Sequence, residues 1–326
     1  MSDIEPIELY IGPSIDLRTI FSDEFWWEPR IGFDGRIYFL RALDEEAYIE
    51  LVLPEEPVQK SCDYQVVILD GEQYEGITIK DQKKAYSYVQ PLPNNHFLLV
   101  SSRSIYYGNG EFDKNATVVK REGHECKVVQ EFLIGDGLSH VYSTEKGSIW
   151  TGYFDEGVFG NWGWADPTVK DPRPPVGEPG VIKWSQTGEQ LFVNTQAEIA
   201  DCYAMNVISD SEVWFYYYDS FKLAHVKNGV FKEYDPQFES AHDFIVNEKH
   251  VLLREDHLFQ LYEIQGDHLK KIAMIHLLDE DEEQIGEGNP FVEVRGDRLV
   301  FISGYDLYDI RLDEIVEMTH EMLEDE

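Results

Sequence analysis

Cysteine is scarce in this chain, and the few cysteines lie far apart. Only Cys62, Cys126 and Cys202 occur among its 326 residues, and no CxxC pair is present. This spacing supplies neither a disulfide framework nor a structural zinc site, because both need paired or clustered cysteines. We therefore expect free thiols in a reducing compartment, and hence a cytoplasmic protein.

Long apolar runs are also missing. No stretch approaches the roughly 18 consecutive apolar residues that predict a membrane-spanning helix. The first residues, MSDIEPIELYIGP, lack the basic and apolar regions of a secretory signal peptide. The sequence therefore gives no reason to expect a membrane as a partner.

Basic residues are few compared with acidic ones. The 27 Lys and Arg residues stand against 63 Asp and Glu, which gives a formal net charge of −36. Such a field repels nucleic acid and anionic membranes and attracts cations: a basic protein, a polycationic substrate or divalent metal ions. Excess carboxylate can also serve solubility alone. The acids concentrate in Asp279–Glu283, a predicted solvated loop, and in residues 313–326, a predicted acidic tail.

Known catalytic motifs are absent too. The chain contains no GxSxG, HExxH, Walker A or GxGxxG sequence. We therefore assign no catalytic residue, and the sequence favours a non-catalytic protein. Helical periodicity is equally rare: only residues 312–323 have a pattern compatible with a helix, and a strand fits that segment equally well.

What the chain does contain is a repeated phrase, in which a turn and a polar residue precede three or four mostly apolar residues. Copies recur at intervals of roughly fifty residues: FDGRIYFL (33–40), PNNHFLLV (93–100), EKGSIWTG (145–152), SDSEVWFY (209–216), NEKHVLLR (247–254) and RGDRLVFI (295–302). Short alternating segments before and after each copy, joined by NG, DG and GD turns, are typical of four-stranded antiparallel meanders.

Six such units in series predict an all-β fold, a six-bladed β-propeller of four-stranded blades. We expect one domain over residues 1–326, because no Ser- or Gly-rich linker divides the chain. The strand-like segment Ile7–Gly12 has no unit of its own and is expected to close the ring by pairing into the last blade. A pair of β-sandwiches or two stacked domains is the alternative architecture.

The repeated strand–turn–strand phrase, as in FIVNEKHVLL and FVEVRGDRLVFI, resembles the six-bladed propellers of the NHL and SMP-30/gluconolactonase type. The resemblance runs from about Trp26 to Leu312. It implies the fold more than an activity, since the family includes calcium-dependent lactonases and esterases alongside binding scaffolds. In those enzymes Glu, Asn and Asp side chains hold a divalent ion at the mouth of the central channel. That ligand set has no residue-by-residue match in this chain, so a metal role stays unassigned.

One insertion interrupts the repeat. About 25 residues with five prolines separate two predicted strands, 148–154 and 180–185, where a hairpin normally needs only a few. We expect this loop to present aromatic side chains that wall a pocket or contact surface: Tyr153, Phe159, Trp162 and Trp164. Asp155, Glu156 and Asn161 are the expected polar contacts, and their oxygens also suit Ca²⁺. The alternative is that the aromatic residues only plug the channel or cover a blade edge.

A second set of candidates precedes the first strand of each unit, near the expected channel mouth. It comprises Glu28, His140, Asp201, His242, Asp243 and Asn289. Carboxylates, imidazoles and an amide in one ring could bind a metal or transfer protons, although satisfied structural hydrogen bonds are commoner. His242 and Asp243 are adjacent on a strand and point to opposite faces, so they do not form a dyad.

Three hypotheses follow from these patterns. The first is a non-catalytic acidic propeller that binds a basic protein, as an immunity or inhibitor protein does, without a cofactor. The second is a metal-dependent hydrolase or lactonase of the SMP-30 type, using Ca²⁺ or another divalent ion. The third is a glycan-binding propeller in which Trp162 and Trp164 form stacking platforms.

Overall fold

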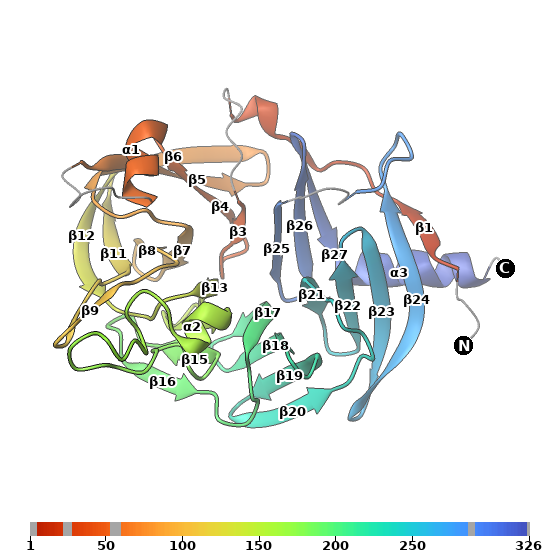
Figure 1. Cartoon of the computed structure of the whole chain (residues 1–326). Helices are drawn as coiled ribbons and strands as arrows, with labels where there is room; N and C mark the ends of the chain where they lie inside the picture. Colours follow the sequence, from red (N-terminus) through yellow and green to blue (C-terminus); the bar gives the residue numbers. More distant parts are fainter. Residues whose placement is uncertain (1–4, 22–27, 53–59, 286–290, 325–326) are drawn as a thin grey trace. The chain divides into compact units, whose positions relative to one another are not determined.

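The fold was analysed in a computed structural model, which describes residues 5–21, 28–52, 60–285 and 291–324. Strands dominate the described residues (Figure 1). The backbone contacts divide the chain into two compact units, one made of Arg30–Cys202 and one of Met1–Pro29 together with Tyr203–Glu326. Whether both belong to a single domain, as the sequence suggests, stays a prediction.

The unit Arg30–Cys202 begins with an eight-stranded sheet made of two antiparallel meanders. The first meander contains β3 (Arg30–Ile31), β4 (Ile37–Ala42), β5 (Cys62–Asp70) and β6 (Gln73–Gln82); the second contains β7 (Tyr88–Leu92), β8 (His96–Val100), β11 (Ala116–Glu122) and β12 (Glu125–Phe132). A single parallel pair, Glu125 with Thr78, joins the outer edges β12 and β6. The helix α1 (Glu45–Val52) connects β4 to β5, and Asp44 caps its first turn.

The same unit ends with a third meander, which carries the insertion. Its strands are β13 (Leu138–Ser143), β14 (Ile149–Tyr153), β15 (Val181–Trp184) and β16 (Gln190–Val193), paired in that order. The insertion lies between β14 and β15 and opens with the short helix α2 (Asp155–Phe159), as Figure 1 shows in yellow-green. A small separate hairpin, β9 (Tyr106–Gly108) with β10 (Glu111–Phe112), interrupts the second meander between β8 and β11.

The other unit contains three further sheets. The first is a meander of β17 (Asp201–Ser209), β18 (Glu212–Tyr218), β19 (Lys222–Lys227) and β20 (Val230–Tyr234). The second consists of β21 (Asp243–Val246), β22 (His250–Glu255), β23 (Leu258–Gln265) and β24 (His268–Leu278), and the third of β25 (Phe291–Arg295), β26 (Arg298–Ser303) and β27 (Asp306–Arg311). These are the propeller-type sheets expected from the repeat.

The N-terminal segment adds a strand to each of two sheets, which corrects the expectation for Ile7–Gly12. Strand β1 (Ile7–Tyr10) pairs in parallel with β24, not with the final sheet. The final sheet instead receives β2 (Ile15–Asp16), antiparallel to β27, before the 3₁₀ turn η1 (Leu17–Thr19). The reason is apolar packing: Leu9 is buried in the core cluster that contains Ile275 and Leu277 of β24.

The segment predicted as an acidic tail forms a helix in its described residues, which agrees with the helical alternative for residues 312–323 and not with the strand. Helix α3 spans Leu312–Glu324 and buries Ile315 and Thr319, whose hydroxyl donates to the carbonyl of Ile315. Asp313 and Glu314 occupy the first turn, where the helix dipole favours negative charge. The buried positions explain why these residues do not behave as a free charged tail.

Each repeated phrase corresponds to the second strand of a meander: β4, β8, β14, β18, β22 and β26. Each of these strands has a neighbour on both sides in its sheet and buries at least half of its side chains. The all-β, propeller-type fold is therefore confirmed. The predicted count of six separate blades is not confirmed, because the first two expected units form one eight-stranded sheet.

Candidate functional site

The insertion between β14 and β15 is fastened to the β9–β10 hairpin. Tyr106 N–H donates to the carbonyl of Trp162 (2.9 Å), and Asn109 N–H donates to the carbonyl of Lys170 (2.8 Å). The Tyr106 hydroxyl also donates to the carbonyl of Asp171 (2.5 Å). Because backbone groups supply most of these bonds, the insertion has a defined path despite its length.

Two glycines allow the helix α2 to approach the loop before β13. A Cβ atom on Gly137 would lie 2.4 Å from the Cα of Gly157, and one on Gly157 would lie 2.5 Å from the carbonyl oxygen of Asp136. Gly137 also has a φ of +69°, a conformation that strains other residues. The N–H of Phe154 donates to the carbonyl of Gly137 (2.9 Å) at this contact. The start of the insertion is therefore held by backbone against backbone.

Two of the predicted aromatic contacts are buried, which corrects the expectation that they line a pocket or surface. Tyr153 has no exposed surface, and its hydroxyl donates to the carbonyl of Ile134. Trp164 is 5% exposed, and its indole N–H donates to the carbonyl of Ser104 (2.8 Å). Its ring lies 4.9 Å from the ring of Tyr106, centroid to centroid. Both residues anchor the insertion through these hydrogen bonds and ring contacts.

The other two predicted aromatic side chains are exposed. Phe159, the last residue of α2, is 65% exposed, and Trp162 is 49% exposed. The β9–β10 hairpin adds two more exposed rings, Tyr107 and Phe112. The sequence analysis missed this pair because their exposure depends on the hairpin, whose Gly108–Asn109–Gly110 turn was the only signal. Loop aromatics from two segments thus form the candidate site.

Arg103 links the buried and exposed parts of this site. Its guanidinium lies 3.0 Å from the carboxylate of Asp136 and donates to Glu156 Oε2 at 2.5 Å. The same group lies over the rings of Phe154 (5.3 Å) and Trp162 (5.6 Å), both measured to the ring centroid. One cation therefore positions the first turn of α2 and the exposed tryptophan.

The predicted polar contacts lie where the insertion begins. Hydrogen bonds from Asn161 and Arg103 lower the pKa of Glu156, so this carboxylate is ionised at neutral pH. The Oδ1 atom of Asp155 accepts from the N–H of Glu156 (2.7 Å), and the Oδ1 atom of Asn161 accepts from that of Trp162 (2.8 Å). These bonds shape the local turns, and the side chains remain at the surface or half-buried.

Two carboxyl groups behind the insertion are buried enough to hold a proton. Burial raises the pKa of Asp136 to about 6, against a hydrogen bond from the N–H of Ser104 and the charge of Arg103. Burial, with the nearby charge of Asp155, also raises the pKa of Asp201 to about 6. Neither Arg103 nor Asp136 was predicted, although the GDG sequence at 135–137 marks the tight turn that buries Asp136.

The predicted channel-mouth residues have separate surroundings. His140 Nε2 lies 3.1 Å from the carbonyl oxygen of Cys202, in the same unit as Asp201. His242 is exposed, 4.0 Å from Asp256, whereas Asp243 pairs with Arg254. Glu28 is exposed. Asn289 lies outside the described residues. Within 5–21, 28–52, 60–285 and 291–324, no group of three or more His, Cys, Asp or Glu residues could hold a metal ion.

The buried Asp136 carboxyl leads to a prediction about pH. Its pKa is higher in the folded protein, about 6, than in the unfolded chain, about 3.9. Between these values only the folded state keeps the proton, so the stability contributed by Asp136 is expected to fall as pH rises from about 4 to about 6. Urea unfolding across this range should show that the stability of the native chain relative to Asp136→Asn decreases as pH rises.

Asp171→Asn, which changes an exposed carboxyl in the same unit, is the control for this measurement and should leave the pH slope of stability unchanged. The substitution of Asp136 places an amide beside Arg103, so a constant loss of stability at every pH is also expected. A pH slope equal to that of the native chain would contradict the assignment of the raised pKa to Asp136.

Comparisons with known proteins give one partial family match and distant structural similarities. Residues 178–305, less than half of the chain, match the model of the YxzG family. No curated protein matches the sequence. Among solved structures of β-propeller proteins, the chain is similar to virginiamycin B lyase from Staphylococcus aureus (11% identity, 86% of this chain and 78% of the other, TM-score 0.46).

Two further solved structures show the same level of similarity. One is YCF48 bound to D1 peptide (11% identity, 87% of this chain and 78% of the other, TM-score 0.47). The other is a putative 6-phosphogluconolactonase from Bacteroides fragilis (11% identity, 83% and 85%, TM-score 0.39). At such identities and TM-scores the similarity says nothing about ligand or activity. Among the described residues, no helix is both long and apolar enough to cross a membrane.

Proposed function

We propose that this chain is a non-catalytic, six-bladed β-propeller that binds a basic protein. Support for six blades comes from the sheets themselves: the eight-stranded sheet consists of two four-stranded meanders, and each remaining repeat unit has a sheet of its own. Free thiols at Cys62, Cys126 and Cys202 agree with a cytoplasmic location, which is part of the proposal.

The observation that carries the binding proposal is the loop surface formed by the β9–β10 hairpin and residues 154–173, here called the aromatic–acidic surface. It combines four exposed aromatic side chains with exposed or half-buried carboxylates: Tyr107, Phe112, Phe159 and Trp162 with Glu111, Asp113, Asp155, Glu156, Asp166 and Asp171. Aromatic residues on an otherwise polar surface are typical anchors of protein interfaces, and loops held by a rigid scaffold commonly carry binding.

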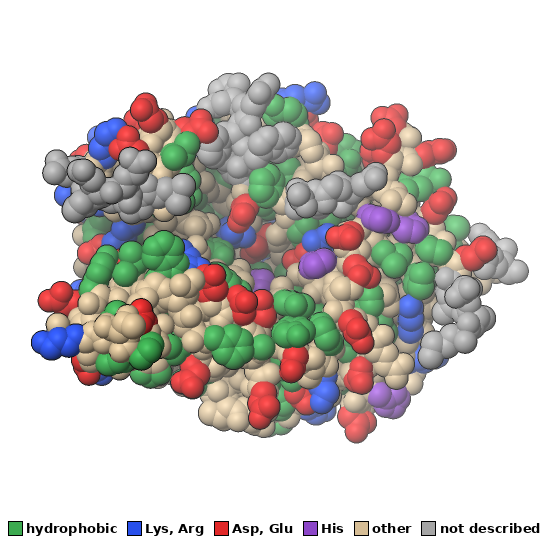
Figure 2. All heavy atoms as spheres, viewed as in Figure 1, with side chains coloured by type: hydrophobic (Ala, Val, Ile, Leu, Met, Phe, Trp, Pro, Cys, Tyr) green, Lys and Arg blue, Asp and Glu red, His purple; other side chains and the backbone are tan. Residues whose placement is uncertain are grey.

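The charges of this surface favour a cationic partner. Arg103 is paired with Asp136 and Glu156, and Arg173 is paired with Asp171, so these ion pairs cancel charges of both signs. The other carboxylates of the surface, those of Glu111, Asp113, Asp155 and Asp166, outnumber the one further base of residues 154–173, Lys170. Acidic side chains are spread over the face drawn in Figure 2, with fewer basic ones between them. With a net charge of −36, the whole chain attracts basic proteins at long range, which raises the rate of association.

The two alternative functions have less support. The glycan-binding hypothesis needs both Trp162 and Trp164 at the surface for stacking on a sugar, but Trp164 is buried. A metal-dependent hydrolase or lactonase needs a ligand set around Ca²⁺ or another divalent ion, and the described residues contain no such group. The hydrolase hypothesis therefore rests on the family resemblance alone, and the protein-binding proposal is preferred.

A peptide selection tests the proposed function. A library of random peptides is selected on the purified chain, and the enriched peptides are measured by calorimetry from about 50 to about 500 mM NaCl. We expect enriched peptides with a net positive charge and an affinity that falls with salt, because screening weakens charge attraction between exposed groups. Enriched peptides without net positive charge, or an affinity independent of salt, would contradict the proposal.

A further inference from the structure

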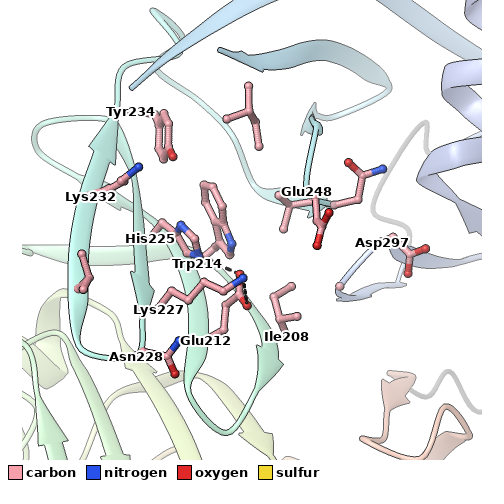
Figure 3. Close-up of a pocket in the computed structure, with 15 residues that line it drawn as sticks. Ile208, Glu212, Trp214, His225, Lys227, Asn228, Lys232, Tyr234, Glu248 and Asp297 are labelled. Carbon is pink, nitrogen blue, oxygen red and sulfur yellow. Dashed lines mark hydrogen bonds and ion pairs between the residues drawn. The ribbon is translucent and has the colours of Figure 1, made fainter. Parts of the chain in front are cut away.

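A cavity of about 710 Å³ lies in the unit of Tyr203–Glu326, whereas the residues of the aromatic–acidic surface belong to the unit Arg30–Cys202. One wall is formed by side chains from the meander β17–β20. The opposite wall comes from the turns after β21 and β25 (Figure 3). Its volume lies within the range of small-molecule pockets. No pattern in the sequence predicted this cavity.

Aromatic rings line the cavity on the β18–β20 side. The ring of His225 stacks on that of Trp214, with 3.8 Å between centroids and 11° between planes. The ring of Tyr234 lies 5.4 Å from Trp214 at 22°. These side chains share one face because Trp214 and His225 are direct cross-strand partners. The three nearly parallel rings form one apolar wall of the cavity; because Trp214 and Tyr234 are each only 4% exposed, a planar group in the cavity meets a small part of these two rings.

Hydrogen bonds hold His225 in place as a neutral imidazole. Burial lowers its pKa even though Glu212 acts in the opposite direction. A neutral ring therefore donates from Nε2 to Glu212 Oε1, at 2.9 Å, while Glu212 Oε2 pairs with Lys227 at the same distance. Both oxygens of Glu212 are thus engaged, and this carboxylate positions the wall instead of offering a free charge.

Two other charges on opposite walls have no ion-pair partner among the described residues. Lys232 lies on β20 beside Tyr234, and Glu248 lies on the turn between β21 and β22. Figure 3 shows them on the two sides of the cavity, with Trp214 between. Asp297, also at the cavity, already pairs with Arg311 (3.1 Å). The pocket therefore has one cation and one anion outside any ion pair between described residues, and the charge of Glu248 also acts on Lys227, which is paired with Glu212.

We propose that this cavity binds a small aromatic zwitterion, such as an aromatic amino acid. The ligand's anionic group pairs with Lys232, its ammonium group pairs with Glu248, and its ring packs along Trp214 and Tyr234. Opposite charges on opposite walls select a molecule that carries both charges over one with a single charge, because the latter leaves one pocket charge without a partner. This proposal is independent of the binding of a basic protein elsewhere.

Calorimetry with three matched probes tests the proposal. Tryptophan carries both charges, indole-3-propionate lacks the ammonium group, and tryptamine lacks the carboxylate. We expect tryptophan to bind about tenfold more tightly than either single-charge probe, since a hydrogen bond to a charged group is worth roughly that factor. No binding by tryptophan at millimolar concentration, or equal affinity for all three probes, would overturn the proposal.

Substitutions of two exposed residues that line the cavity test whether tryptophan binds there. Lys232→Met should weaken tryptophan about tenfold and bring its affinity close to that of tryptamine, and Glu248→Gln should bring it close to that of indole-3-propionate. The matched controls Lys270→Met and Glu239→Gln, on exposed residues that do not line the cavity, should leave the affinity unchanged. Unchanged tryptophan affinity in both pocket variants would place any binding elsewhere and overturn the proposal.

Discussion

Replacing Gly137 with alanine is expected to lower the free energy of unfolding by about 3 kcal/mol or more, because two costs add. The residue has a φ of +69°, and its new Cβ would lie 2.4 Å from the backbone of Gly157 in α2. Backbone cannot rotate away as a side chain can, so α2 must move. The Phe154 N–H bond to Gly137 is expected to be lost with it.

Gly71→Ala is the control that separates these costs. Gly71 has a similar φ, +59°, but no atom lies within 4 Å of a Cβ built there. Its substitution should therefore cost only the strain of the left-handed conformation, about 1 kcal/mol. Urea unfolding of both variants gives the comparison. Equal losses for Gly71→Ala and Gly137→Ala would contradict the close packing of α2 against the loop at 135–137.

The strands could be predicted from the sequence because the signals that form them are local. Period-2 alternation and NG, DG or GD turns determine where a strand ends and which side it buries, and all six repeated phrases are second strands of meanders. Local signals do not determine which edge a lone strand joins. The alternation of Ile7 and Leu9 predicted β1, but its pairing with β24 depends on the buried Ile275 and Leu277.

The candidate site was predictable only as a segment. Trp162 and Trp164 are two residues apart in one loop, yet one is exposed and the other buried. The difference is produced by Ser104 and Tyr106, about sixty residues earlier, which bond to and pack against Trp164. The same holds for Arg103, whose partners Asp136 and Glu156 are far away in sequence. Contacts between distant loops cannot be deduced from composition.

Replacing Trp162 with alanine is expected to weaken binding of a basic partner about 30-fold or more, as truncation of an interface tryptophan commonly costs about 2 kcal/mol. The fold should tolerate the change. The side chain is half exposed, and the carbonyl of residue 162 still accepts the hydrogen bond from Tyr106. Loss of the Trp162 ring removes its cation–π contact with Arg103, but the guanidinium of Arg103 stays paired with Asp136 and Glu156.

The decisive measurement compares two aromatic residues of similar exposure in the same unit, Trp162 (49%) and Tyr74 (54%). Tyr74 on β6 is 54% exposed and lies outside the aromatic–acidic surface, so Tyr74→Ala is the match for Trp162→Ala. Calorimetry with one selected basic peptide should give a large loss of affinity for Trp162→Ala and a change within about twofold for Tyr74→Ala. Equal affinities for the two variants would contradict binding through the aromatic–acidic surface.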